Sequence, residues 1–270
     1  MTAPDDGAQE GPQRIWTIGD YPAIARHLRP ISLQVLDTVG VTPGLRVLDV
    51  GVGDGNTAIE AAHRGGVVTG IDLTPMQIER ARRRAEREGV VLDLRVGDAA
   101  DLPYDDASFD LVVSVLGAMF APDHERAARE LVRVCRPGGT VAFVAWADAG
   151  WYRTWRDGVG AIIPPPPPGT VRPDEWGHVD EAVRRFTVAG LDARAEVRPF
   201  HWSFPSTRDA ADLFLGASGS FIAFREAATR AGNGDRVQPE LLAALDEANE
   251  ATDGTCRLTA PYLLAQGPRP

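Results

Sequence analysis

A glycine-rich turn follows the first strongly apolar run of the chain. Residues 49–56 read Asp-Val-Gly-Val-Gly-Asp-Gly-Asn, which places Gly51, Gly53 and Gly55 at alternate positions. Glycines at this spacing let the backbone turn sharply and approach a ligand, because a Cβ there would occupy the ligand's space. The segment therefore predicts a small-molecule site between a strand and the helix that follows it.

Two acids close the next two predicted strands. Asp72 stands 21 positions after Gly51, where a carboxylate can accept hydrogen bonds from ribose hydroxyls. Asp98 is placed to accept a hydrogen bond from an exocyclic amine of adenine. A dinucleotide fingerprint would need a glycine at the sixth position counted from Gly51, but that position is Asn56. The spacing favours a nucleoside ligand that has no pyrophosphate.

A parallel sheet would bring these residues together. Short apolar runs alternate with segments of helical period, at lengths that suit right-handed crossovers. We therefore expect an α/β fold with a Rossmann-like, doubly wound sheet of about seven strands. The first five predicted strands lie at 45–50, 67–71, 91–96, 109–115 and 141–146, with helices at 57–64, 75–88 and 123–134.

The two ends of the chain depart from this alternation. Residues 15–39 have helical spacing, and Pro22 and Pro30 stand where they would open or break a helix, which predicts two short helices. The last strands are expected in the main sheet, with a helical cap inserted between them. The later predicted elements are a helix near 183–188, a long strand at 193–204, two or three helices within 210–251 and a strand at 258–266.

The predicted organisation has three parts. Residues 1–14 form a flexible arm, 15–148 a ligand-binding core with N-terminal helices, and 149–270 a substrate cap with the final strands of the same sheet. Residues 164–168 are five consecutive prolines, which predict a stiff polyproline segment at the surface.

Composition narrows the class of protein. A formal charge of -10 over 270 residues argues against a nucleic-acid partner. No apolar run approaches the roughly 20 residues that cross a bilayer, and the chain begins with polar residues, so we expect a cytoplasmic protein with no membrane segment. All 28 basic residues are arginines, which removes Schiff-base chemistry on lysine, and residues 82–87 are predicted to form a solvated helix face. Cys135 and Cys256 are too far apart in sequence for a metal cluster, and no metal site is predicted.

Five motifs occur in a specific order. They are VLDVGVGDG at 47–55, GIDLTP at 70–75, GDAADLP at 97–103, SFD at 108–110 and RPGG at 136–139. Together they resemble the ordered motifs of class I S-adenosylmethionine-dependent methyltransferases, in the small-molecule branch that includes ubiquinone- and menaquinone-type enzymes. The resemblance covers about residues 15–150.

The resemblance implies S-adenosylmethionine as the cofactor. The glycine turn would approach the methionine moiety, Asp49 would support the turn and the amino group, and Asp72 would take the ribose. Tyr21 would close the pocket from the N-terminal helices. Asp54 departs from the family pattern, in which that position is often threonine or serine. The implied cofactor-binding residues are Tyr21, Asp49, Gly51, Gly53, Gly55, Asp72, Leu73, Gln77, Asp98, Ala99, Val115 and Leu116.

Aromatic residues cluster just past the fifth predicted strand, where open α/β sheets bind ligands. These residues either contact the acceptor or fill the core. Transfer of a sulfonium methyl needs alignment and exclusion of water, and no base is obligatory. The predicted substrate-binding residues are Met119, Trp146, Trp151, Tyr152 and Trp155, and the candidates for a general base are Asp148, His178 and His201.

The predicted function is methyl transfer from S-adenosylmethionine to oxygen, carbon or nitrogen of a bulky or aromatic small molecule. We expect a monomer or homodimer acting in secondary metabolism. An alternative keeps the cofactor as a bound scaffold, while the protein catalyses a cyclisation or decarboxylation or serves as a binding module. The glycine turn is the same in both cases, so the sequence leaves both open.

Overall fold

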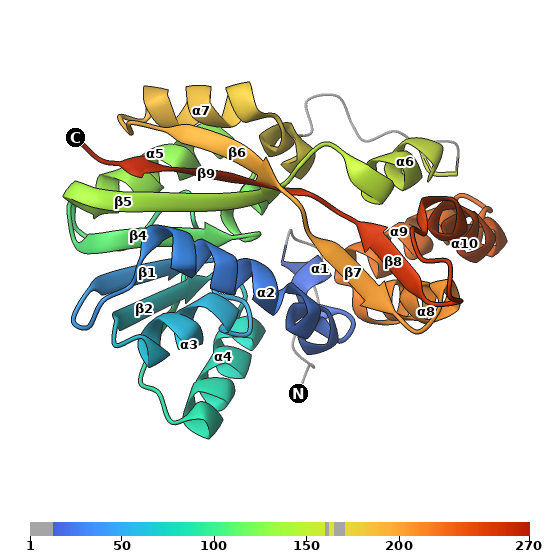
Figure 1. The fold of residues 1–270 in the computed structure, drawn as a ribbon, viewed down its shortest axis with the longest axis horizontal. Coiled ribbons are helices and arrows are strands. Elements are labelled where there is room, and N and C mark those ends of the chain that lie inside the picture. The colour runs from blue at the N-terminus through green and yellow to red at the C-terminus, as the bar shows by residue number, and fades with distance from the viewer. Residues whose placement is uncertain (1–12, 160–161, 165–170) are drawn as a thin grey trace, which may run out of the picture.

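A mixed seven-stranded sheet forms the centre of the molecule (Figure 1). The structure is a computed structural model, and it describes residues 13–159, 162–164 and 171–270. The strand order is β3-β2-β1-β4-β5-β9-β6, in which β1 to β5 pair in parallel and β9 runs antiparallel to β5 and β6. This confirms the predicted doubly wound α/β fold. The strands are β1 (Arg46–Val50), β2 (Val67–Asp72), β3 (Asp93–Val96), β4 (Phe109–Val115), β5 (Cys135–Trp146), β6 (Arg194–Arg198) and β9 (Tyr262–Pro268).

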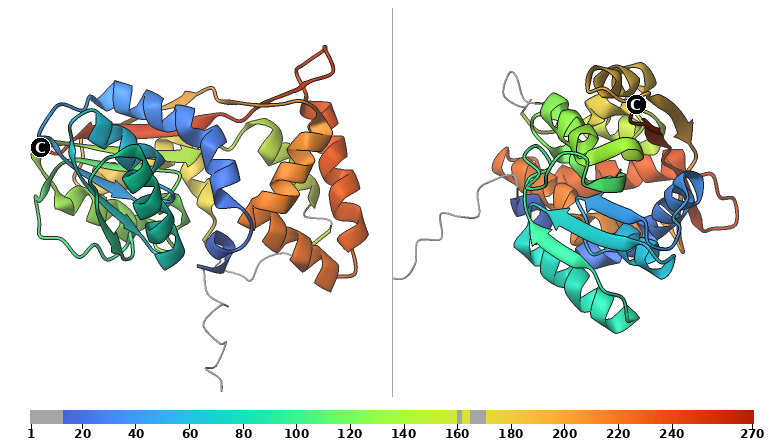
Figure 2. Two further views of the ribbon diagram at one scale, coloured as in Figure 1. Left: turned by 90° about the horizontal axis from the view of Figure 1, so that it is seen from below. Right: turned by 90° about the vertical axis from the view of Figure 1, so that its left-hand side faces the viewer.

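Helices cover both faces of the sheet (Figures 1 and 2). One face carries α2 (Tyr21–Val39), α3 (Asn56–His63) and α4 (Pro75–Glu88), and the other carries α5 (His124–Val134) and α7 (Val179–Val188). Side chains alternate along each strand, so that Val47 packs with the first group and Leu48 with the second. Because both faces are buried, the central strands are nearly uninterrupted apolar runs, and this made them recognisable in the sequence.

The N-terminal helices differ from the prediction of two short helices. A single turn, α1 (Arg14–Thr17), precedes a 19-residue helix α2 that continues through Pro30. Pro22 lies in the first turn of α2, where the missing N–H leaves no bond unmade. Pro30 is tolerated because the turns that follow are held by burial, with Val35 and Leu36 fully enclosed against the sheet.

The late strands also differ from the prediction. The segments expected as single strands at 193–204 and 258–266 are each divided, and β7 (His201–Phe204) pairs with β8 (Cys256–Thr259) in a separate two-stranded sheet. Pro199 and Pro261 stand at the two divisions, where a residue without an N–H cannot continue a ladder. Only β6 and β9 therefore join the main sheet as predicted.

Helices pack around the second sheet at one end of the molecule (Figure 2). Their shared interior is aromatic and includes Trp151, Phe214 and Phe221. The group contains three helices within the predicted range 210–251 and one, α6, that had no predicted counterpart. The helices are α6 (Gly150–Val159), α8 (Thr207–Ala217), α9 (Gly219–Arg230) and α10 (Val237–Ala248), and the 3-10 turn η4 (Gly234–Arg236) joins α9 to α10. Two further 3-10 turns, η2 (Ala118–Phe120) and η3 (Pro173–Gly177), lie outside this group. We refer to α6, α8, α9, α10, β7 and β8 as the cap.

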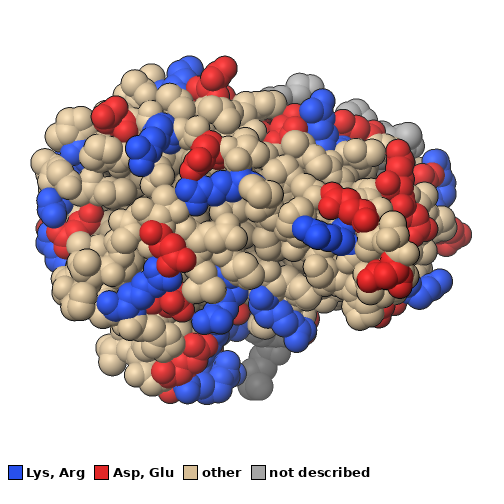
Figure 3. All heavy atoms as spheres, in the orientation of Figure 1, with Lys and Arg blue, Asp and Glu red and all other residues tan. Residues whose placement is uncertain are grey.

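Parts of the predicted organisation are not tested by the structure. Residues 1–12 of the predicted arm and prolines 165–168 lie outside the described residues. The predicted boundary after residue 148 falls two residues past the end of β5 and stays a prediction. Within the described ranges, no helix is long and apolar enough to cross a membrane. On the face drawn in Figure 3, arginines are interspersed with acidic side chains.

The carboxyl ends of the parallel strands place the predicted site residues along one edge of the sheet. Asp49 near the end of β1 is in register with Gly70 of β2 and with Val113 of β4. The turns that follow these three strands therefore meet at the same edge.

Candidate functional site

The glycine turn after β1 has the backbone that only glycine adopts readily. Gly51, Gly53 and Gly55 have φ of 75°, 56° and 95°. A Cβ on Gly51 would lie 2.6 Å from Cα of Gly117, and one on Gly53 would lie 3.0 Å from the hydroxyl of Tyr21. The expectation that these Cβ atoms would occupy the ligand's space is therefore wrong for both positions, because the protein itself fills that space.

The turn after β4 packs directly against the glycine turn. Ser114 Oγ donates to the carbonyl of Val50 at 2.6 Å and accepts from the amide of Ala118 at 2.9 Å, which ties the ends of β1 and β4 together. Leu116 has a φ of 55°, a strained conformation for a branched residue, and its amide donates to Val144 O. Sequence reasoning placed Leu116 here and missed Ser114, although a serine in an otherwise apolar strand was a usable signal.

Asp72 at the end of β2 holds the glycine turn in place. Its Oδ2 accepts from the amide of Gly53 and its Oδ1 from the amide of Thr74, both at 2.9 Å. Burial raises the pKa of Asp72, and the two amide bonds oppose that shift. Each carboxylate oxygen has a second lone pair, so Asp72 still has acceptor capacity for a hydroxyl.

Asp49 is a buried carboxylate with an unused oxygen. The residue is 2% exposed, and its Oδ2 has no hydrogen-bond partner among the described residues. Burial raises the pKa of Asp49 to about 7, and the charge of Asp72 raises it further, against a hydrogen bond from the backbone of Ala58. A buried acceptor without a partner costs free energy, and a ligand that brings an N–H or a cation would remove that cost.

Aromatic side chains cover the glycine turn. Tyr21 packs against Gly53, and Trp16 makes edge contacts with Tyr21 and Phe120 at ring distances of 6.2 and 4.6 Å. Burial and the nearby carboxylates raise the pKa of Tyr21. Gln77 is buried and donates from Nε2 to the carbonyl of Trp16 at 3.1 Å, so α1 and α4 are linked across the turn. Trp16 and Phe120 were not among the predicted site residues.

Asp54, the departure from the family pattern, pairs with an arginine. Arg84 Nη1 donates to Asp54 Oδ2 at 3.2 Å and to Asn56 Oδ1 at 2.6 Å. Burial raises the pKa of Asp54, and the Arg84 guanidinium opposes that rise. The side chain of Arg84 is only 18% exposed, so the expectation of a solvated face across residues 82–87 is wrong at this position.

The remaining predicted cofactor positions lie along the same edge. Asp98 and Ala99 are half-buried in the turn after β3, where Asp98 Oδ1 accepts from the amide of Ala100 at 2.9 Å. The preceding amide, of Gly97, donates to the carbonyl of Asp72, which joins this turn to the end of β2. Leu73 and Val115 are half-buried at the ends of β2 and β4. Their roles toward a ligand stay predictions.

The predicted substrate-binding residues do not form one cluster. Trp151 and Trp155 are 5% exposed, and their rings stack on Phe214 and Phe221 in the interior of the cap. Tyr152 lies beside both tryptophans.

Trp146 packs at the edge of the hydrophobic cluster that contains Trp151 and Trp155, whereas Met119 lies apart from it. Met119 is buried in the core on the α5 face of the sheet. Trp146, at the end of β5, is half-buried and packs near Phe200 and Trp202.

Two of the three candidate bases come together. His178 Nε2 lies 3.7 Å from Asp148 Oδ2, and Asp148 Oδ1 accepts from Arg156 Nη2 at 3.0 Å. His201 instead lies on β7, where its Nδ1 is 3.0 Å from the hydroxyl of Thr259 on β8. The arginine pairing makes Asp148 a link between the end of β5 and α6.

Comparison with known proteins agrees with this geometry. Residues 48–143 match the sequence model of the family described as "Methyltransferase domain". This stretch of the chain therefore resembles a methyltransferase domain. The match spans β1 to β5 and includes Asp49, the glycine turn, Asp72 and Asp98, whereas the cap lies beyond it.

Relatives are similar to this chain in sequence, and solved structures are similar to it in fold. An uncharacterized protein of Mycobacterium tuberculosis is 42% identical over 159 residues, which are 56% of this chain and 58% of that protein. Nocamycin O-methyltransferase of Saccharothrix syringae is 36% identical over 142 residues, or 50% and 51% of the two chains. The chain thus matches little more than half the length of these relatives. The crystal structure of YcgJ from Bacillus subtilis has a TM-score of 0.61 at 21% identity, covers 89% of this chain and 98% of its own, and so shares the fold.

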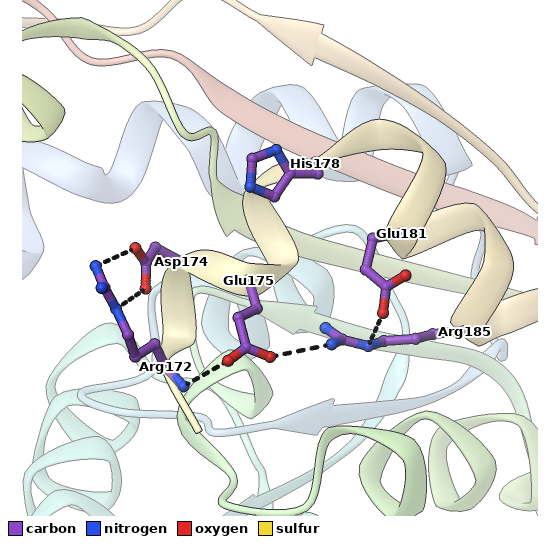
Figure 4. A pocket seen from close by; sticks show the side chains of 6 residues that line it. All are labelled: Arg172, Asp174, Glu175, His178, Glu181 and Arg185. Carbon is purple, nitrogen blue, oxygen red and sulfur yellow. Dashed lines mark hydrogen bonds and ion pairs between the residues drawn. The ribbon is translucent and has the colours of Figure 1, made fainter. Parts of the chain in front are cut away.

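Outside the matched region, a cavity of about 350 Å³ lies beside the start of α7. Its lining is charged, and Figure 4 shows Arg172 paired with Asp174 and Arg185 paired with Glu175 and Glu181. His178 stands apart from these pairs in the same view. This charged lining is not the apolar lining expected for a bulky aromatic ligand.

Proposed function

We propose that this protein transfers the methyl group of S-adenosylmethionine to a small-molecule acceptor. The observation that carries the proposal is the buried Oδ2 of Asp49 beside the glycine turn, which has no hydrogen-bond partner in the part of the chain that the structure describes. A cationic amino group would satisfy that oxygen, and the free lone pairs of Asp72 would suit ribose hydroxyls. Asp98 and Ala99 would take the adenine edge, so the residues present fit this cofactor.

The chemistry divides between the cofactor and the chain. Bound S-adenosylmethionine supplies a methyl group already activated on a sulfonium. Trp16, Tyr21 and Phe120 cover the turn and exclude water, and Ser114 and Asp72 fix the strand ends that align the reactants. Because the methyl group is already activated, its transfer does not require a general base from the protein.

The acceptor we propose is a bulky, largely apolar molecule of secondary metabolism. Trp146 is half-buried at the end of β5 and is backed by the buried rings of Phe200 and Trp202. The similarity to nocamycin O-methyltransferase supports an acceptor of this kind, although that match does not reach the full length of either protein. The monomeric or homodimeric state and the cytoplasmic location stay predictions.

A radiolabelled assay tests the proposal. The full chain is incubated with S-adenosylmethionine labelled in its methyl group and with a panel of phenolic, carboxylic and polyketide acceptors. We expect label to appear in an acceptor and S-adenosylhomocysteine to form in equal amount. Conversion of an acceptor without loss of label would favour the bound-scaffold alternative. Calorimetry that shows no binding of either nucleoside would refute both readings.

A further inference from the structure

A salt bridge anchors the glycine turn to α4. Asp54 in the turn accepts from Arg84 Nη1, and the same nitrogen donates to Asn56 at the start of α3. Asn56 donates in turn to the carbonyl of Ala25 in α2 at 2.7 Å. The side chains of Asp54 and Arg84 are 11% and 18% exposed, so water screens this pair less than it screens a surface pair.

Three carboxylates lie near the predicted position of the cofactor. Asp49, Asp54 and Asp72 all raise the pKa of Tyr21, whose ring lies against Gly53, so all three act on one hydroxyl at the turn. Within the described part of the chain, Asp54 is the member of this trio that pairs with an arginine. The Oδ2 of Asp49 is buried and has no hydrogen-bond partner within the described ranges.

The cofactor and its product differ by one unit of charge. S-adenosylmethionine carries a sulfonium that S-adenosylhomocysteine lacks, while their amino and carboxylate groups are the same. In a shielded site a charge several ångströms away changes the affinity for the cation and leaves the affinity for the neutral product nearly unchanged. We infer that the balance of charge between Asp54 and Arg84 sets how strongly the site prefers the methyl donor over the demethylated product. This inference rests on the proposed function.

A charge cycle on the full chain tests the inference. Calorimetry measures the dissociation constants of S-adenosylmethionine and S-adenosylhomocysteine for the wild type, Asp54→Thr, Arg84→Gln and the double variant. Asp54→Thr leaves the positive charge of Arg84 without its partner, so the preference for S-adenosylmethionine over S-adenosylhomocysteine should fall about fivefold. Arg84→Gln leaves the negative charge of Asp54 without its partner, so the same preference should rise about fivefold. The double variant removes both charges and should return to within about twofold of the wild type.

Arg83→Gln is the matched control. Arg83 lies on the same helix and loses the same charge, but its side chain is 68% exposed and pairs with Glu79. Its ratio of dissociation constants should equal that of the wild type. Thermal unfolding of each ligand-free variant reports folding, and Asp54→Asn replaces Asp54→Thr where the latter is unfolded.

The outcomes separate the inference from the proposed function. Equal changes in both affinities would show that the pair only anchors the turn, and this would overturn the inference. A double variant with the ratio of either single variant would overturn it too. A wild type that binds neither nucleoside would instead refute the proposed function.

Discussion

Among single residues, Asp49 is a buried carboxyl whose ionisation destabilises the folded protein and which is also predicted to bind the cofactor. Burial raises its pKa from 3.8 to about 7, so the folded state holds the proton more tightly than the unfolded state. The stability that this group contributes is complete below pH 3.8 and is lost as the pH rises through about 7. Asp49→Asn cannot ionise, so it does not lose stability as the pH rises. The ligand-free variant should therefore be more stable than the wild type at pH 8, by about 2–4 kcal/mol.

Urea unfolding at pH 5 and pH 8 measures this difference. The stabilisation by Asp49→Asn should shrink at pH 5, where the wild-type carboxyl is protonated in the folded state. Asp101→Asn is the control, because the side chain of Asp101 is 79% exposed and its charge is solvated in both states. A variant that is less stable than the wild type at both pH values would contradict the burial argument.

The same carboxyl predicts a pH dependence of cofactor binding. If the ionised form of Asp49 holds a cationic amino group, binding must compete with protonation below pH 7. The dissociation constant of S-adenosylmethionine should then rise up to tenfold for each pH unit below 7 and level off above it. Asp49→Asn should bind weakly with a flat profile between pH 5.5 and 8. Calorimetry on both proteins tests this, and parallel profiles would exclude Asp49 as the titrating group.

Sequence reasoning assigned to the candidate site residues that lie in recognisable motifs, and it missed contacts that form only in three dimensions. Asp49 and Asp72 were predicted because their positions relative to strand ends repeat across one fold. Gly117, whose Cβ would lie 2.8 Å from Cα of Gly51, comes from a different turn, and no local pattern signals that contact. Arg84 was misjudged for the same reason, since its partner Asp54 is 30 residues away.

At the scale of elements, helix α2 offers a direct test of how burial overrides local preference. Pro30 lies inside this helix and cannot donate the backbone hydrogen bond that an interior residue makes. Pro30→Ala restores a donor and a better helix former, so the free energy of unfolding should rise by about 1–3 kcal/mol. Pro22→Ala, in the first turn, should change it by less than about 1 kcal/mol. Thermal or urea unfolding measures both changes in the free energy of unfolding. A Pro30→Ala variant that is less stable than the wild type would show that the packing of α2 requires the proline.

The elements that were predicted well share one physical property. The inner parallel strands β1, β2, β4 and β5 are mostly buried and appear as apolar runs whose lengths fit the alternation with helices, whereas β3 at the sheet edge is largely exposed. The late strands were merged, because the alternating patterns of 193–204 and 258–266 continue across Pro199 and Pro261 while the chain changes sheets. Pairing with a distant strand decides which sheet each half joins, and periodicity along the chain does not report that partner.

At the scale of the whole molecule, an ion-pair cluster joins the cap to the sheet. Arg156 of α6 donates to Asp148, just past β5, and to Asp174 of η3, so one guanidinium spans three segments. The side chains of Arg156, Asp148 and Asp174 are all mostly buried. Removal of the arginine would leave Asp174 with its exposed partner Arg172 and Asp148 with only the longer contacts to Arg153 and His178. The loss of such a partly buried pair costs more than the loss of an exposed pair.

Arg156→Met should therefore lower the free energy of unfolding by about 1–3 kcal/mol in low salt. The deficit should narrow in 1 M NaCl, because salt screens the repulsion between Asp148 and Asp174. Arg153→Met is the control, since Arg153 is 55% exposed and its contacts with the carboxylates of Asp148 and Asp157 are 3.9 and 3.8 Å long. The affinity for S-adenosylmethionine should stay within about twofold of the wild type, because the cluster lies outside the glycine turn. A larger loss of cofactor affinity than of stability would instead place Arg156 in the binding site itself.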